Sequence, residues 1–314
     1  MTYTREDVTF ISEGLSCKGW LYRPKEHSGK RPTIVMAHGF SAVKEMYLPN
    51  FAERFAEAGF IVLVFDYRFI GESEGEPRQQ VIPAEQIKDY RNAITWVSQQ
   101  EQVDAERIGI WGSSYSGGHV LSIAARDRRV KAVVSQAPCV DGFKNAQLLS
   151  VASREQQDPT VEVQLPRLSG FTQVLQNYRQ ARYDGAPIEY MPVVAPEGEK
   201  SALPTPDSFD WFTRAGATIA PNWVNQVTME TMEAYLDYYP TDLIDRISPT
   251  PLLMIVAEND EITPTELAVA AYERAKQPKK LEMISGGHFS AYTEPGLSSS
   301  APAALAWFKK HLTP

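Results

Sequence analysis

A serine that follows an apolar strand, with glycines on either side of it, is the most informative feature of the sequence. The strand runs into Gly112 and a helix begins at about Tyr115, so Ser114 would lie at a sharp turn between the two elements. Such a turn exposes the serine hydroxyl and aims the Tyr115 amide at negative charge that develops on a substrate carbonyl. Ser116 stands where the usual G-x-S-x-G pattern has its second glycine. Ser114 is the candidate nucleophile, and Ser113 is a less favourably placed rival.

A serine hydroxyl becomes a nucleophile at neutral pH only when a base takes its proton and an acid orients that base. The chain supplies both residue types in the order Ser, Asp, His, because Asp260 follows one apolar strand and His288 follows the next on a Gly-rich loop. Parallel strands would bring these residues to one edge of the sheet. The sequence therefore predicts a catalytic triad of Ser114, His288 and Asp260. The alternative acids are Glu258, Glu261 and Asp141.

The remaining requirement is a pair of amides that stabilise an oxyanion. His38-Gly39-Phe40 ends an earlier strand, and glycine lets a backbone amide approach a carbonyl oxygen closely. We expect the Phe40 amide to act with the Tyr115 amide, and His38 to do no more than fix the loop. No metal or organic cofactor is expected. The other histidines, His27, His119 and His311, have no metal-ligand spacing.

A second stretch with regularly placed small residues runs from Asp66 through Arg68, Gly71 and Ser73 to Gly75. A nucleotide-binding loop is the functional interpretation, but the stretch has neither the GxGxxG pattern nor the Lys-Ser/Thr pattern that holds phosphates. We interpret it as a structural turn near the pocket wall.

Short apolar runs alternate with longer amphipathic stretches along most of the chain. This alternation predicts an α/β fold with a mainly parallel sheet. A hairpin is expected at residues 8–11 and 15–22, with proline near the start of later helices at Pro83, Pro264 and Pro302. The expected strands are 33–37, 60–65, 107–111, 132–135, 252–256 and 281–284, and the expected helices are 51–58, 84–97, 266–275 and 303–312.

The alternation stops after Pro138 and resumes at Pro251. The segment between these prolines is rich in proline and aromatic residues. We expect an inserted, mainly helical cap at residues 140–249, between the two parts of a core at 1–139 and 250–314. Its rings would either line a pocket for an apolar substrate or pack on the core.

The composition excludes several classes of function. With 31 Lys and Arg against 39 Asp and Glu, the formal charge is −8, and no basic stripe is present that would bind nucleic acid. The longest apolar run, Phe60–Phe65, is far shorter than the about 20 residues that cross a bilayer. Because the first residues also lack the pattern of a signal peptide, we expect a cytoplasmic protein. Cys17 and Cys139 are expected to be buried small hydrophobes.

Taken together, the motifs resemble the α/β-hydrolase superfamily: His-Gly-Phe, then D-Y-R-x-x-G-x-S-x-G, then G-x-S-Y-x-G-G, then the Asp and His loops. The resemblance covers about residues 15–140 and 250–312. The serine turn is similar to that of X-prolyl dipeptidyl-peptidase-like hydrolases. Residues 112–121 and 127–138 also resemble the fungal polyketide transferase and thiohydrolase group, often called dienelactone-hydrolase-like.

This resemblance implies an α/β-hydrolase fold and acyl transfer from an ester or thioester through an acyl-serine. Dienelactone hydrolase itself uses cysteine where this chain has Ser114. We therefore expect a carboxylesterase-like serine hydrolase whose substrate is a small molecule, an apolar or aromatic ester or thioester, with a homodimer left open. The alternatives are an acyltransferase or thioesterase for a polyketide-like acyl group, a carbon–carbon bond hydrolase or peptidase, and a non-catalytic binding protein on the same fold.

Overall fold

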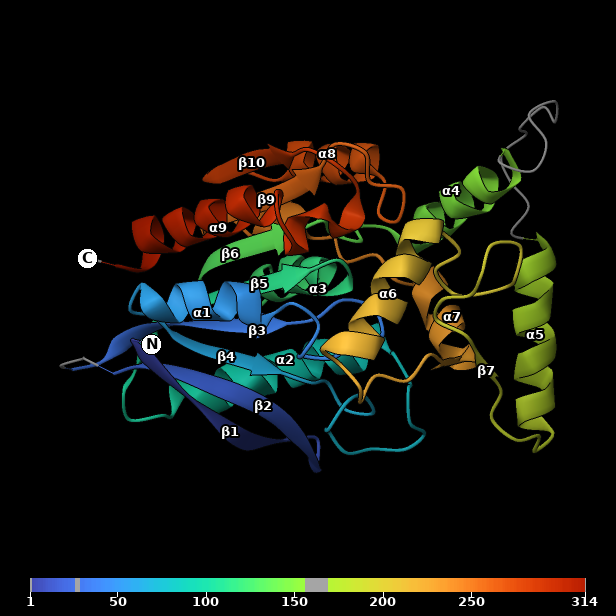
Figure 1. Ribbon diagram of the computed structural model, residues 1–314, viewed down its shortest axis with the longest axis horizontal. Coiled ribbons are helices and arrows are strands. Elements are labelled where there is room, and N and C mark those ends of the chain that lie inside the picture. The colour runs from blue at the N-terminus through green and yellow to red at the C-terminus, as the bar shows by residue number, and fades with distance from the viewer. Residues whose placement is uncertain (1, 26–28, 156–168, 314) are drawn as a thin grey trace.

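An eight-stranded sheet forms the centre of the molecule in this computed structural model, which describes residues 2–25, 29–155 and 169–313 (Figure 1). The strand order is β1-β2-β4-β3-β5-β6-β9-β10. β1 and β2 form the expected hairpin, β2 pairs antiparallel with β4, and every other pair is parallel. The strands are β1 (Tyr3–Ser12), β2 (Leu15–Pro24), β3 (Arg31–Ala37), β4 (Ile61–Phe65), β5 (Val103–Ser113), β6 (Val130–Gln136), β9 (Leu252–Ala257) and β10 (Lys279–Ile284).

Helices cover both faces of this sheet, which confirms the α/β prediction. On one face, apolar side chains of α2 (Pro83–Ser98), α3 (Tyr115–Ala124) and α8 (Thr265–Arg274) pack on the strands. On the other face, α1 (Pro49–Glu57) and α9 (Leu297–Leu312) do the same. Burial of apolar surface on both faces explains why the central strands are almost entirely apolar in sequence.

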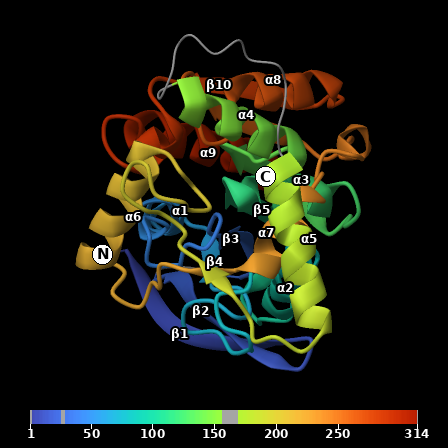
Figure 2. The ribbon, with the colours of Figure 1, turned by 90° about the vertical axis from the view of Figure 1, so that its right-hand side faces the viewer.

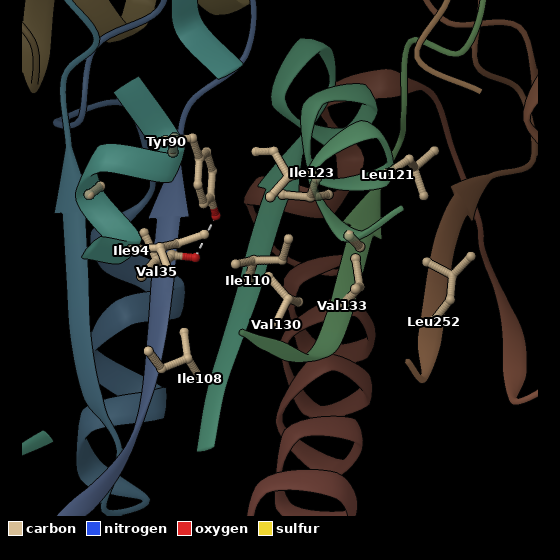
Figure 3. Packing of buried hydrophobic residues seen from close by; sticks show 14 of the residues in the cluster. Val35, Tyr90, Ile94, Ile108, Ile110, Leu121, Ile123, Val130, Val133 and Leu252 are labelled. Carbon is tan, nitrogen blue, oxygen red and sulfur yellow. Dashed lines mark hydrogen bonds between the residues drawn. The ribbon is translucent and has the colours of Figure 1, made fainter. Parts of the chain in front are cut away.

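A buried tyrosine joins helix α2 to two central strands (Figure 3). The Tyr90 hydroxyl lies 2.6 Å from the carbonyl oxygen of Val35 in β3 and 2.8 Å from that of Trp111 in β5. Around it, Ile94, Ile110 and other aliphatic residues fill the space between the helices and the sheet. The strand that leads to Ser114 is thus held in a densely packed layer.

Helix α9 begins earlier than the sequence predicts. It starts at Leu297, so Pro302 lies inside the helix rather than near its beginning. The extra turn is stabilised because Leu297 and Ala301 are buried against the sheet and the Ser300 hydroxyl donates to the carbonyl of Ala291 at 2.8 Å. This burial offsets the amide donor that a proline removes from a helix.

The segment between β6 and β9 lies beyond the carboxyl ends of the central strands (Figures 1 and 2). Many of its apolar residues form a cluster with Phe40, Met46 and Tyr115 of the rest of the chain, whereas Ile244 and Ile247 pack in the core against the sheet. Residues 156–168 of the predicted cap and His27 lie outside the described residues. The elements of this segment are α4 (Gly142–Glu155), α5 (Ser169–Tyr183), β7 (Tyr190–Met191), α6 (Pro206–Thr218), β8 (Val227–Thr228), α7 (Met229–Leu236) and the short 3-10 helix η1 (Ile244–Arg246).

None of the helices in the described part of the chain combines the length and the apolar character needed to span a membrane.

Candidate active site

Ser114 occupies a strained turn between β5 and α3. Its backbone has φ 58° and ψ −116°, a conformation that non-glycine residues rarely adopt. Gly112 makes the turn possible, because a Cβ atom on it would lie 2.2 Å from the carbonyl oxygen of Ser116. The predicted strand-to-helix turn is therefore present, with Ser114 at its centre.

The structure brings Ser114 together with the predicted base and acid. The His288 Nε2 atom lies 3.0 Å from Ser114 Oγ, and His288 Nδ1 lies 2.8 Å from Asp260 Oδ2. A carboxylate can only accept a hydrogen bond, so Nδ1 carries the proton and Nε2 is free to accept the serine proton. His288 belongs to the 3-10 helix η2 (His288–Tyr292), directly after β10, and both His288 and Asp260 are buried.

Further donors hold the Asp260 carboxylate in place. The amides of Ile262 and Thr263 donate to Oδ1 at 3.0 and 2.8 Å. The Thr263 hydroxyl lies 2.9 Å from Oδ2, 3.1 Å from His288 Nδ1 and 3.0 Å from the carbonyl oxygen of Ala137. Thr263 thus links the acid loop to the end of β6. It was not identified from the sequence, where a lone threonine three residues after an aspartate carries no distinctive signal.

The alternative acids are engaged elsewhere. Glu258 accepts from the Ser285 hydroxyl at 3.0 Å, and Asp141 accepts from the amide of Lys144 at 3.0 Å, while Glu261 is exposed. Among the described residues, none of these three carboxylates is hydrogen-bonded to His288. Of the four carboxylates compared, Asp260 is the one with the geometry of an orienting acid.

The rival serine is also engaged away from the histidine. Ser113 is fully buried and accepts hydrogen bonds from the Tyr292 hydroxyl at 2.6 Å and from Gln136 Nε2 at 3.2 Å.

The two cysteines are buried as expected, and burial raises the pKa of the Cys17 thiol and raises that of Cys139 to about 12. At neutral pH neither cysteine is a thiolate nucleophile.

The two predicted oxyanion donors belong to segments that meet at Ser114. Tyr115 is the first residue of α3, so its amide has no partner within the helix. Gly39, the residue before Phe40, lies so close that a Cβ atom on it would be 2.8 Å from the Ser114 Cβ atom. Neither the Phe40 amide nor the Tyr115 amide donates a hydrogen bond to another group of the described chain. Amides without a partner of this kind are what an oxyanion site requires.

A pocket that opens to solvent lies over Ser114 and His288. Its walls come from the loop after β3, from the segment between β6 and β9, and from the loops after β9 and β10. No Asp, Glu, Lys or Arg is among the lining residues. Besides Ser114 and His288, these are His38, Gly39, Phe40, Ala42, Met46, Leu48, Leu203, Trp211, Phe212, Ile262, Phe289 and Tyr292.

Two tryptophans of the segment between β6 and β9 connect it to the loops after β10 and β3. Trp211 of α6 stacks on Phe289 with ring centroids 4.7 Å apart and an angle of 22° between the ring planes. Trp223 donates from Nε1 to the carbonyl oxygen of Ser41 at 3.0 Å. The aromatic residues of the predicted cap therefore serve both purposes foreseen: Trp211 lines the pocket, whereas Tyr238 packs on Tyr115 below it.

A buried ion-pair cluster anchors the loop that carries Phe40. Asp66 accepts from the Lys44 amide at 2.8 Å and from Lys44 Nζ at 2.9 Å, and its carboxylate also lies 3.5 Å from His38 Nε2. Asp66 thereby holds both ends of the loop, which agrees with a loop-fixing role for His38. The carboxylates of Glu45, Asp66 and Glu72 are close enough to hold a cation, but the Lys44 ammonium contacts all three and occupies that position.

The rest of the 66–75 stretch makes structural contacts, as predicted. Arg68 pairs with the buried Asp89 of α2 at 2.6 Å. The Ser73 hydroxyl donates to the carbonyl of Asp66 at 2.6 Å and accepts from the Lys18 amide at 2.9 Å. None of these residues lines the pocket.

His119 is fully buried beneath Tyr115 and has two polar neighbours. Its Nδ1 atom lies 2.7 Å from the Tyr238 hydroxyl, and its Nε2 atom lies 2.9 Å from Gln86 Oε1. Burial, and after it the charge of His38, lowers the pKa of His119 to about 3. His119 is therefore neutral at physiological pH. Its two hydrogen bonds hold the ring in place beneath the serine turn.

A buried neutral histidine makes stability depend on pH. In the unfolded chain His119 has a pKa of about 6.5, so below that pH the unfolded state binds a proton that the folded state does not bind. The neutral His119 therefore contributes its full share of the unfolding free energy above about pH 6.5, and this share is lost as the pH falls towards 3. Between pH 7 and pH 5 we expect the wild type to lose about 2 kcal/mol more unfolding free energy than His119→Gln. Urea unfolding at the two pH values measures this; equal losses would contradict the buried neutral state.

Comparison with known proteins places the chain in a family. Residues 14–290 match the model of the X-Pro dipeptidyl-peptidase (S15 family). The chain is 32% identical over 286 residues to the quorum-quenching protein AidA of Acinetobacter baumannii, covering 91% of this chain and 88% of the relative. It is 34% identical over 287 residues to the thiohydrolase aneE of Aspergillus aculeatus, covering 89% of this chain and 84% of the relative.

The solved structures agree with the sequence relatives. The crystal structure of the α/β hydrolase GrgF from Penicillium sp. superposes with a TM-score of 0.80 at 28% identity, over 99% of this chain and all of GrgF. A polyketide transferase of that name is 29% identical in sequence over 314 residues. The chain belongs to the X-Pro dipeptidyl-peptidase (S15) family and has the α/β-hydrolase fold that its motifs predicted.

Proposed function

We propose that the chain is a serine hydrolase that cleaves an ester or thioester of an apolar acyl group through an acyl-serine intermediate. The observation that carries the proposal is the hydrogen-bond relay from Ser114 through His288 to Asp260, at distances of 3.0 and 2.8 Å, beneath a pocket without charged side chains. A relay of this kind is how a serine is activated as a nucleophile. No cofactor is required, because the relay supplies both nucleophile and base.

In the first half-reaction, Ser114 Oγ attacks the carbonyl carbon while His288 Nε2 takes the serine proton. The negative charge that forms on the carbonyl oxygen would be stabilised by the Phe40 and Tyr115 amides. Asp260 keeps the proton on Nδ1 and stabilises the imidazolium. The bond to the leaving alcohol or thiol then breaks, and His288 gives that group its proton.

In the second half-reaction, water attacks the acyl-serine and His288 takes a proton from that water. Collapse of the tetrahedral intermediate releases the carboxylic acid, and the proton returns to Ser114. An alcohol, thiol or amine in place of water would make the same site an acyltransferase. The relative named polyketide transferase favours this second candidate, whereas the relative named thiohydrolase favours hydrolysis, and product analysis distinguishes the two.

We assign residues 1–139 and 250–314 to a catalytic core and residues 140–249 to a cap. The contribution of the cap to the site supports this division, because Leu203, Trp211 and Phe212 form one wall of the pocket. The cap would therefore select the acyl group. No carboxylate among the lining residues could pair with the free amino terminus of a peptide, which argues against a dipeptidyl-peptidase activity.

A pair of substrates that differ in acyl charge tests the assignment. We expect p-nitrophenyl butyrate to be cleaved with a kcat/KM at least about 100-fold higher than that of p-nitrophenyl hemisuccinate, because an unpaired carboxylate is costly to bury. Leu203→Lys, which adds an ammonium to the pocket wall, should reduce the ratio of the two kcat/KM values. Equal rates for the two esters would contradict an apolar acyl pocket. Binding without turnover of either ester would favour a non-catalytic protein.

A further inference from the structure

The residue that departs from the usual serine-turn pattern makes two specific hydrogen bonds. Ser116, where a glycine is expected, is fully buried in the first turn of α3. Its Oγ atom lies 2.5 Å from the carbonyl oxygen of His38 and 2.6 Å from the hydroxyl of Tyr67, which is also fully buried. A glycine at this position would make neither bond.

The directions of these two bonds follow from the chemistry of the groups. A carbonyl oxygen only accepts, so the single hydroxyl proton of Ser116 goes to His38. The Tyr67 hydroxyl must then donate its proton to Ser116. The resulting chain runs from Tyr67 through Ser116 to the carbonyl of His38 among fully buried side chains, where successive hydrogen bonds strengthen one another.

This chain joins the two segments that carry the proposed oxyanion amides. His38 lies two residues before Phe40, and Ser116 lies one residue after Tyr115. The segments also touch at Gly39 and Ser114, where no room remains for a Cβ atom on the glycine. The Ser116 bond therefore sets how far apart the Phe40 and Tyr115 amides can lie.

We propose that Ser116 is a positioning residue that fixes the spacing of the oxyanion amides by holding the carbonyl of His38. This inference rests on the function proposed above and goes beyond it, because it assigns a role to a residue that touches neither the substrate nor the base. A displacement of about 1 Å in such a site lowers the rate by as much as about 100-fold.

A second buried serine provides a matched control. Ser135 of β6 is also fully buried, and its hydroxyl donates to the carbonyl oxygen of Gly117 at 2.8 Å, in the same turn of α3. Within the described chain, its hydroxyl has no hydrogen bond to the loop that carries Phe40. Ser135→Ala therefore removes a comparable buried hydrogen bond without releasing the oxyanion loop.

The test compares Ser116→Ala with Ser135→Ala in the full chain. We expect Ser116→Ala to lower kcat for p-nitrophenyl butyrate by about 10- to 100-fold with KM within twofold, because the bond acts on the transition state. Inhibition by a trifluoromethyl ketone, whose adduct places an oxyanion between the two amides, should weaken by a similar factor. Ser135→Ala should keep both values within threefold at a comparable loss of thermal stability.

Equal kcat and ketone affinity for the two variants would overturn the proposal and leave Ser116 with a structural role alone. If Ser116→Ala does not fold, Ser116→Gly, which has the residue usual at this position of the serine turn and makes neither bond, is measured in the same assays. A fall in both kcat and ketone affinity supports the proposal, and wild-type values contradict it. A wild-type protein without turnover would instead refute the proposed function itself.

Discussion

Replacement of Ser114 by alanine is expected to lower the kcat/KM for p-nitrophenyl butyrate by about 10⁴- to 10⁶-fold, the range seen when the nucleophile of a Ser-His-Asp relay is removed. The loss follows because no other described hydroxyl lies within hydrogen-bond distance of His288 Nε2. The Cβ atom is retained, so the contact with Gly39 and the turn itself should persist. Steady-state kinetics, with thermal unfolding to check the fold, measure the effect.

The neighbouring serine is the matched control for this variant. Ser113→Ala removes a buried hydroxyl that is bonded to Tyr292 and Gln136 on the other side of the turn. We expect it to retain turnover within about tenfold, because loss of a buried hydrogen bond acts mainly on stability. Comparable losses in both serine variants would show that turnover reports the integrity of the turn and not the nucleophile.

The second large effect is expected from Asp260→Asn, which should lower kcat by about 10⁴-fold. An asparagine can present its amide group to His288 Nδ1, which favours the tautomer with the proton on Nε2. In that tautomer the histidine cannot accept the proton of Ser114. The effect should fall on kcat far more than on KM, because Asp260 does not line the pocket.

Two further carboxylates test the choice of acid. Asp141→Asn and Glu258→Gln change residues that bond to Lys144 and Ser285 and not to His288. Both variants are expected to keep kcat within about threefold, in contrast to Asp260→Asn. A loss of about 10⁴-fold in either would mean that another acid orients the histidine when substrate is bound.

The parts of the site that could be predicted are those that depend on local sequence and topology. Gly112 and Ser114 define a turn that only a strand followed by a helix can form, and the alternation of strands and helices places Asp260 and His288 at the same edge of a parallel sheet. Residue order predicted that the three side chains share one edge, because parallel strands share the direction of their carboxyl ends. It left Glu258, Glu261 and Asp141 open as alternative acids.

The parts that could not be predicted depend on contacts between segments far apart in the chain. Thr263 and Ser116 act through bonds to Ala137 and His38, and nothing in their own neighbourhood indicates those partners. The choice of Trp211 over Tyr238 as a pocket residue depends on how the 140–249 segment packs. Its proline-rich connections give no periodic pattern from which that packing could be derived.

Ser114 is expected to carry the acyl group, and trapping of the acyl-enzyme shows which residue does so. Wild type is mixed with p-nitrophenyl butyrate, quenched in acid within the first turnovers and measured by intact mass, followed by peptide mapping. A fluorophosphonate probe is run in parallel on wild type, Ser114→Ala and Ser113→Ala. We predict a butyryl adduct and a phosphonyl adduct on Ser114 in wild type, labelling of Ser113→Ala, and no labelling of Ser114→Ala. An acyl-serine mechanism at Ser114 would be contradicted if folded wild-type protein formed no adduct, or if the adduct lay on any other residue.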